Sequence, residues 1–241
     1  MGNLISNPPD ATPFMETARS FGNYDLQSAL ADLIDNSITA KCKTIEIECE
    51  WNGGDPIIKI KDDGKGMSES ELIQAMKPAS SNPIGKRDPD DLGRFGLGLK
   101  TASFSQARRL TVVSKKNEIC GARWDLDNIS NWSMEILDAE ELLDISDLHL
   151  KQNSGTEVIW QKADRLAENE KMIEDSFNET VLNATKELSK IFHRYLKPDA
   201  GGHFSKIDII VNGNKLPAFD PFYSGHSATQ GQPEEHIPVN D

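Results

Sequence analysis

The sequence predicts an α+β fold, a two-layer sandwich in which helices cover one face of a mixed, mostly antiparallel sheet. Two alternating segments joined by a Gly-rich turn predict a β-hairpin within residues 43–62. Further strands follow a glycine-rich stretch at residues 93–98, and segments with apolar residues at helical spacing flank these strands.

Residues 1–40 predict an arm and two helices. The first nine residues are polar and indicate a flexible arm, and residues 11–20 indicate a short helix. Residues 24–40 indicate a longer helix. Its apolar side chains form one stripe at helical spacing: Leu26, Ala29, Leu30, Leu33 and Ile34.

Residues 43–62 contain the hairpin signal. In the segment 43–51, apolar residues alternate with Thr and Glu, which is typical of a strand with one buried face. Residues 52–55 read Asn-Gly-Gly-Asp and predict a turn. The segment 56–62 then predicts the returning strand, with Ile58 and Ile60 on the same face.

Residues 68–108 predict two helices separated by a loop. Ser68 and Glu71 form a capping-box pattern that opens a short helix ending near residue 77. Residues 78–92 are polar and rich in Pro, Ser and Asp, and an irregular stretch of this length favours a lid. The glycine-rich stretch then leads into a helix ending near residue 108.

The remaining segments alternate between strands and helix. Strands are predicted at 110–115, 121–126, 132–137 and 156–161, and one long helix or two at 166–196. A last strand at 206–212 precedes an Asn-Gly-Asn turn at 212–214, and the chain after residue 220 is polar and irregular.

Composition excludes several classes of protein. The 39 acidic and 26 basic residues give a formal net charge of −13, which argues against a free-standing nucleic-acid binder. The chain has no apolar run long enough to span a membrane, and its N-terminus lacks the pattern of a secretory signal. Cys42, Cys49 and Cys120 form no Cys-x-x-Cys pair, which predicts free thiols in a reducing compartment and no structural zinc.

Two polar residues interrupt the apolar helix at 24–40. Asp32 and Asn36 lie four residues apart, so they share one face of the helix. A carboxylate and an amide in this arrangement are suited to holding a hydrated metal ion and a water molecule. Whether they do so depends on a phosphate ligand supplied by the rest of the chain.

Asp62 comes at the end of the second hairpin strand, on the same face as Ile58 and Ile60. A carboxylate on the apolar side needs a hydrogen-bonding partner, and a ligand donor would provide one. Gly64 and Gly66 permit close backbone approach, and Met67 offers an adaptable apolar surface for a flat ring. The alternative is an ordinary Asp-Asp-Gly turn before a capped helix.

Two weaker signals follow. The stretch 93–98, Gly-Arg-Phe-Gly-Leu-Gly, precedes a helix, and exposed amides at a helix N-terminus bind anions. It matches neither a Walker A loop nor a dinucleotide-binding turn, and alone it is also consistent with a glycine-rich turn. Thr156 shares a strand face with Val158 and Trp160, so its hydroxyl faces the interior or is satisfied by backbone.

Taken together and in this order, these motifs resemble the GHKL ATPase superfamily of gyrase B, the ninety-kilodalton heat-shock chaperone, histidine kinases and MutL proteins. The resemblance covers residues 24–161 and implies a Bergerat-type ATP-binding fold. The subgroup it is most similar to is the microrchidia (MORC)-type ATPases, on the segments Leu-Ile-Asp-Asn-Ser at 33–37 and Gly-Leu-Lys-Thr-Ala-Ser at 98–103. Residues 211–216 and 219–222 resemble the opening of the transducer domain of that subgroup.

The resemblance implies roles for individual residues. Asn36 would coordinate Mg²⁺, and Asp62 would accept a hydrogen bond from the adenine amine, where guanine presents a carbonyl oxygen. Thr156 would bond the base or a bridging water, and the amides near Phe95 would hold phosphates, with Lys100 a candidate for the terminal phosphate. The full set of implied ATP contacts is Asn36, Asp62, Gly64, Gly66, Met67, Gly93, Arg94, Phe95, Gly96, Leu97, Gly98, Leu99, Lys100 and Thr156.

Asp32 stands where many members of the superfamily have the glutamate that activates the attacking water. Aspartate has the same carboxylate on a side chain one methylene shorter, and general-base geometry is tight. Either Asp32 acts as the base, with slow turnover, or the site binds ATP chiefly as a conformational clamp.

The resemblance also implies an organisation and a function. We expect an arm at 1–22, an ATP-binding domain at 23–165, a connecting helix at 166–200 and the start of a truncated transducer-like domain at 201–241. We expect an Mg²⁺-dependent ATPase that drives conformational change or homodimerisation of a larger cytoplasmic or nuclear protein, with a DNA or protein client and no membrane partner. The alternatives are a non-hydrolysing ATP-binding switch and a protein kinase, for which no helix with an acceptor His precedes the site.

Overall fold

The structure of the chain is a computed structural model. It describes residues 5, 9–20, 24–78, 98–148, 153–166, 174–198, 204–223 and 226–230. The predicted lid and the glycines of the stretch 93–97 lie outside the described residues.

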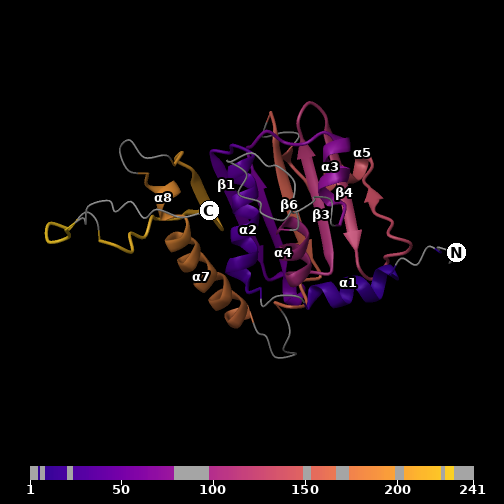
Figure 1. The fold of residues 1–241 in the computed structure, drawn as a ribbon, viewed down its shortest axis with the longest axis horizontal. Coiled ribbons are helices and arrows are strands. Elements are labelled where there is room, and N and C mark those ends of the chain that lie inside the picture. The colour runs from indigo at the N-terminus through magenta and orange to yellow at the C-terminus, as the bar shows by residue number, and fades with distance from the viewer. Residues whose placement is uncertain are drawn as a thin grey trace, which may run out of the picture.

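One mixed sheet of eight strands organises the structure (Figure 1). The strands lie in the order β5-β4-β3-β6-β2-β1-β7-β8, and every neighbouring pair is antiparallel except β1 and β7. Their bounds are β1 Thr44–Glu50, β2 Ile57–Asp62, β3 Arg109–Lys115, β4 Ile119–Asp125, β5 Glu135–Ile136, β6 Gly155–Gln161, β7 Asp208–Val211 and β8 Asn214–Lys215. The mostly antiparallel α+β architecture predicted from the sequence is therefore confirmed.

Helices α2 and α4 pack against each other over the middle of the sheet, and α7 packs against α2 (Figure 1). The bounds of the helices are α1 Ala11–Arg19, α2 Leu26–Thr39, α3 Glu69–Met76, α4 Gly98–Gln106, α5 Ala139–Ile145, α7 Glu174–Ile191 and α8 His193–Leu196, with a short 3-10 turn, η1, at Asn52–Gly54. Side-chain caps that the sequence contains begin α2 and α3. Asp25 accepts the amide of Ser28 at the start of α2, and Ser68 and Glu71 form the predicted capping box of α3.

Strand alternation places the main core between the sheet and these helices. Ile47, Ile60, Val158 and Val112 lie side by side across β1, β2, β6 and β3, because the register pairs them in turn. They belong to one buried apolar cluster with residues of α1, α2, α3, α4 and α7. Burial of an apolar side chain contributes about 1.5–3 kcal/mol, so this layer is the main source of stability.

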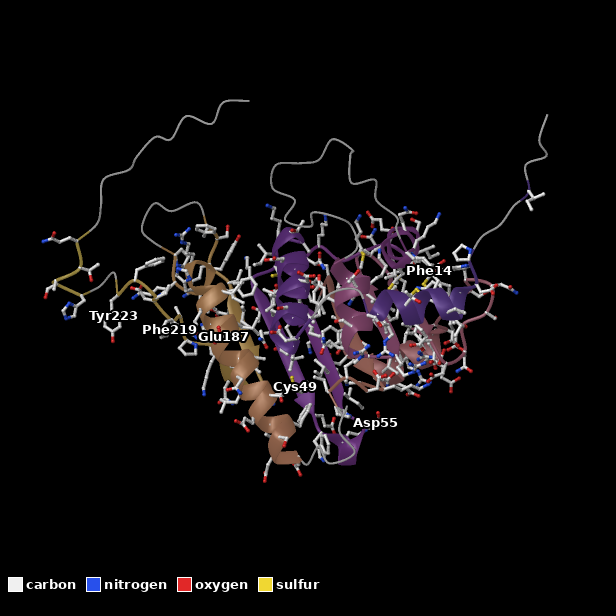
Figure 2. The ribbon with its side chains drawn as sticks, turned by 60° about the horizontal axis from the view of Figure 1, so that its bottom comes forward. Phe14, Cys49, Asp55, Glu187, Phe219 and Tyr223 are labelled. Carbon is white, nitrogen blue, oxygen red and sulfur yellow. The ribbon has the colours of Figure 1, made fainter. Side chains whose placement is uncertain are left out.

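The last two strands extend the sheet beyond β1. β7 runs parallel to β1, with Ile209 opposite Ile45, and β8 pairs with β7 at the edge. Residues 208–215 thus belong to the same sheet as the hairpin, and the division of the chain into domains stays a prediction. Figure 2 shows Phe219 and Tyr223 beyond this edge, at the end of the molecule opposite Phe14 of α1.

One predicted strand differs from the structure, and one helix was not predicted. The strand predicted at 132–137 is only two residues long, because β5 pairs with β4 at Ala122 and Arg123 alone. The segment 166–196, predicted as one long helix or two, contains two helices in its described part, α7 and α8. Helix α5 was missed, although Asp138 caps it through the amides of Glu140 and Glu141.

Helix α5 packs against the opposite face of the sheet from the main core. Val113, whose side chain points away from that of Val112, forms a second buried cluster with Leu137, Leu142 and Leu148. Gly121 of β4 permits this packing, because a Cβ there would lie 2.5 Å from a methyl of Leu142. The second face of the sheet is therefore partly covered by a short helix.

Two neighbouring leucines of α5 test this packing. Leu142 is 4% exposed and Leu143 is 56% exposed. We predict that Leu142→Ala lowers the free energy of unfolding by about 2–5 kcal/mol, because it leaves a cavity against Gly121. The matched variant Leu143→Ala should change it by less than about 0.5 kcal/mol. Urea unfolding followed by circular dichroism measures both, and equal losses in the two variants would contradict the packing of α5.

Candidate nucleotide site

The polar residues predicted to bind the base lie in one row at the end of the central strands. Asp62 of β2 is paired with Thr156 of β6, and Thr156 with Ser114 of β3. Ser114 is in turn paired with Cys120 of β4. All four lie on the helix-covered face, one step beyond the apolar core residues, because strand side chains alternate with a period of two.

Asp62 is a buried carboxylate, only 6% exposed. One oxygen, Oδ1, accepts the amide of Gly64 at 2.8 Å, and Oδ2 accepts the hydroxyl of Ser37 of α2 at 2.9 Å. Burial raises the pKa of Asp62, and these hydrogen bonds oppose the rise. Among the described residues no Lys or Arg forms an ion pair with this carboxylate, so a hydrogen-bond donor from a ligand suits it.

A serine that the sequence analysis did not select, Ser114, ties three segments together at this row. Its hydroxyl accepts the amide of Met67 at 2.8 Å and donates to the carbonyl of Gly155 at 3.0 Å. It also lies 2.8 Å from the hydroxyl of Thr156. Ser114 therefore fixes both the chain after β2 and the start of β6, and it sets the direction in which the Thr156 hydroxyl points.

Gly66 has the most restricted position of the described glycines near Asp62. Its φ is +62°, and a Cβ on it would lie 1.9 Å from the carbonyl oxygen of Lys115. Gly64 is also confined, since a Cβ there would lie 2.8 Å from both Ala40 and the Asp62 carboxylate. The close approach that the sequence predicted for these glycines is an approach to the protein's own backbone and side chains.

Helix α2 carries the predicted metal ligand and general base. Asn36 is exposed and Asp32 is half-buried, one turn apart on α2. Burial raises the pKa of Asp32, and a hydrogen bond from the Tyr24 hydroxyl at 3.1 Å opposes the rise. Burial and the charge of Asp32 raise the pKa of Asp35 to about 6.

Helix α4 brings the end of the predicted phosphate-binding stretch to Asp32. A Cβ on Gly98, the first residue of α4, would lie 3.6 Å from Oδ2 of Asp32. Gly98 and Leu99 are both half-buried. The predicted contacts Gly93, Arg94, Phe95, Gly96 and Leu97 lie outside the described residues, as do the lid residues Lys86 and Arg87.

Lys100 forms a hydrogen bond with helix α3 in this structure. Its Nζ donates to the carbonyl of Ala75 at 2.7 Å, near the C-terminal end of α3. Burial lowers the pKa of Lys100 to about 8. Its contact with the terminal phosphate stays a prediction.

A cavity of about 650 Å³ lies on the opposite face of the sheet. It is lined in part by Lys59, Arg109 and Arg123. Both arginines are already paired with carboxylates, Arg109 with Asp125 at 2.7 Å and Arg123 with Glu135 at 3.0 Å. Their charges are thus compensated within the protein, and the row at Asp62 remains the better candidate for a nucleotide.

Three residues of the site were missed from the sequence, and two carried a usable signal. Ser37 lies four residues after Leu33, where the apolar stripe of α2 would continue. Ser114 follows Leu110 and Val112 in the alternation of β3, at a position where another apolar side chain is expected. A polar residue at a core position needs a partner, which is the signal. Tyr24 carried none, because its contact with Asp32 depends on how the chain enters α2.

A known protein family matches the part of the chain that carries this site. The family model described as "Histidine kinase-, DNA gyrase B-, and HSP90-like ATPase" matches residues 24–156, which include every described site residue. The chain belongs to this family. The membership confirms the predicted GHKL resemblance and supports ATP binding.

Individual relatives of this ATPase-family chain are MORC and MutL proteins. It is 32% identical over 95 residues to the ATPase morc-1 of Caenorhabditis elegans, which covers 39% of this chain and 11% of that protein. It is 34% identical over 93 residues to the DNA mismatch repair protein MutL of Clostridium acetobutylicum, and 34% over 128 residues to MutL of Coxiella burnetii. Those matches cover 38% and 50% of this chain, and 15% and 22% of the MutL proteins.

The chain thus spans less than a quarter of the length of each of these relatives. None of the helices in the described part of the chain is both long enough and apolar enough to cross a membrane.

Two glycines with nearly the same φ test the packing at the base end of the site. Gly66 and Gly53 have φ values of +62° and +64°, but a Cβ on Gly53 meets nothing within 4 Å. We predict that Gly53→Ala costs about 1–2 kcal/mol of stability, the cost of a left-handed conformation. Gly66→Ala should cost at least about 3 kcal/mol, because its methyl collides with a backbone carbonyl. Chemical denaturation measures both, and equal costs would contradict the close approach at Lys115.

Proposed function

We propose that the chain is the Mg²⁺-dependent ATP-binding and ATP-hydrolysing domain of a larger protein, whose nucleotide state drives conformational change or homodimerisation. The observation that carries this proposal is the buried Asp62 carboxylate, which has hydrogen-bond donors but no cation among the described residues around it. It lies in a row of polar groups below the helix that carries Asp32 and Asn36.

Recognition of adenine follows from the chemistry of this row. The adenine exocyclic amine donates a hydrogen bond that a buried carboxylate accepts, whereas guanine places a carbonyl oxygen at the same position. Thr156 lies beside Asp62 and adds a hydroxyl for the base or a bridging water. Met67, partly buried against the core, supplies apolar surface for the ring, and Gly64 and Gly66 let the chain before it pass close to the protein's own backbone.

The donor set on α2 fits a magnesium ion that is shared with phosphates. Mg²⁺ takes oxygen ligands and is usually bound by one or two protein groups plus substrate phosphates and water. Asn36 presents an exposed amide oxygen one turn from Asp32. Residues 93–99 and Lys100 are proposed to hold the phosphates, since the start of α4 lies beside Asp32. When bound, the ion neutralises phosphate charge.

Hydrolysis would use Asp32 as the general base. The water oxygen forms a bond to the γ-phosphorus while the bond from that phosphorus to the β–γ bridging oxygen breaks, and ADP leaves with the electron pair. The proton of the water passes to the Asp32 carboxylate and then to solvent. Aspartate in place of glutamate favours one alternative, a module that binds ATP without hydrolysing it.

The wider role is proposed by analogy with the relatives. The relatives are an ATPase of the MORC type and DNA mismatch repair proteins. We propose an ATP-dependent homodimer in the full-length protein, a DNA or protein client reached through other domains, and a cytoplasmic or nuclear location. We also propose that residues 1–22 form an arm, residues 23–165 the ATP-binding domain, residues 166–200 a connecting helix and residues 201–241 the start of a transducer-like domain.

Asp62 tests the nucleotide site as a whole. We predict that Asp62→Asn weakens ATP binding by about 1–3 kcal/mol, because the variant loses a charge-assisted hydrogen bond in a buried position. Isothermal titration calorimetry measures the affinity, and thermal unfolding confirms that the variant is folded. Asp55→Asn is the matched control, since Asp55 is exposed in the turn at the far end of the hairpin (Figure 2). Unchanged ATP affinity in folded Asp62→Asn would refute the site.

Asp32 separates the ATPase from the non-hydrolysing module. We predict that Asp32→Ala slows single-turnover hydrolysis at least about 100-fold, the usual contribution of a general base. ATP affinity should stay within about threefold of the wild type, because Asp32 is not proposed to contact the adenine. Rapid-quench measurement of ADP gives the rate. A wild-type protein that binds ATP but releases no ADP would support the non-hydrolysing alternative.

A further inference from the structure

We propose that Tyr24 is a positioning residue that holds the Asp32 carboxylate in the orientation from which it accepts a proton from the attacking water. The proposal rests on the proposed function of Asp32 as a general base. Tyr24 does not touch the nucleotide in this account and acts only through Asp32.

The contact joins two points of the chain that are fixed independently. The hydroxyl of Tyr24 lies 3.1 Å from Oδ2 of Asp32, two helical turns further along. The backbone carbonyl of Tyr24 accepts the side-chain amide of Gln106 at 3.0 Å, and Gln106 of α4 is 2% exposed. The Tyr24 ring packs against the main core. Tyr24 is thus held by α4 and the core while its hydroxyl holds a side chain of α2.

The chemistry of the pair leaves one carboxylate oxygen for water. A tyrosine hydroxyl has a single proton, and it is placed to donate to Oδ2. Oδ2 is also the oxygen that lies beside Gly98 at the start of α4. Oδ1 is then left to accept a proton from water, and rotation of the carboxylate is restrained. Fixing the reacting group in advance removes part of the entropic barrier.

This restraint answers the difficulty that aspartate raises. A glutamate reaches further but has an additional rotatable bond, whereas aspartate has a shorter reach and less freedom. A tyrosine that is itself fixed by the core can hold the aspartate carboxylate in one orientation through its hydrogen bond. Burial and the charge of Asp32 raise the pKa of the Tyr24 hydroxyl, so it stays a donor at neutral pH.

The charges around Asp32 indicate what the hydrogen bond does to its titration. On α2, Asp35 lies close enough for the two carboxylates to repel. On α4, Gly98 lies beside Asp32, and the ammonium of Lys100 is bonded to the carbonyl of Ala75. Tyr24 supplies the side-chain hydrogen bond that favours the ionised form of Asp32, against burial. A purely structural role for Tyr24 would leave the titration of Asp32 unchanged.

The test compares Tyr24→Phe with the wild type, because phenylalanine keeps the ring and removes only the hydroxyl. We expect the single-turnover rate at pH 7 to fall about ten- to a hundredfold, with ATP affinity within about twofold. The rising limb of the pH–rate profile should move to higher pH, since the ionised carboxylate loses a donor. Tyr195→Phe is the matched control, because it removes a half-buried hydroxyl near Asp35 and should leave the rate unchanged.

A second measurement makes the outcome independent of turnover. The carboxyl carbon of Asp32, followed by NMR against pH, should titrate at a higher pH in Tyr24→Phe than in the wild type. Unchanged rate, or a rate loss with unchanged titration of Asp32, would overturn the role of Tyr24. If the wild type binds ATP without hydrolysing it, the proposed function of Asp32 fails, and an unshifted NMR titration would also refute the Tyr24 contact.

Discussion

The site depends on one buried carboxylate at the end of a strand. Asp62 lies on the apolar face of β2, and the protein itself meets only part of its hydrogen-bonding capacity, through Gly64, Ser37 and the backbone of Thr156. Burying a carboxylate without a cation is costly, so the surrounding donors are necessary for the fold as well as for the site. The turn at Gly64 and Gly66, the serine of α2 and the register of β6 all serve to place these donors.

Two ends of the proposed site are held by different kinds of packing. At the base end, strand register fixes Asp62, Thr156 and Ser114, and backbone contacts at Gly66 hold the chain over them. At the phosphate end, α2 and α4 approach each other at Asp32 and Gly98. Residues paired across central strands are held rigidly, whereas the end of a helix can shift against a neighbouring helix. We therefore expect conformational change to concentrate at the phosphate end.

The alternation of β1 and β2 and the apolar stripe of α2 were enough to predict the sheet, the helix layer and the face on which Asp62 lies. These patterns are local, and local periodicity is what a sequence records directly. The parallel pairing of β7 with β1 joins segments more than 160 residues apart, and no local pattern indicates it. Helix α5 was missed because it is short and acidic, although Asp138 signals its start. The contacts of Tyr24 with Asp32 and of Lys100 with Ala75 depend on tertiary packing alone.

The central claim is that this chain recognises adenine through a carboxylate, and base discrimination measures that claim most directly. Isothermal titration calorimetry of the wild-type protein with ATP and with GTP, each with Mg²⁺, compares two ligands that carry the same phosphates. The account predicts that ATP binds and that GTP binds at least about tenfold more weakly, because its carbonyl oxygen faces Asp62. Equal affinity for the two nucleotides would contradict it.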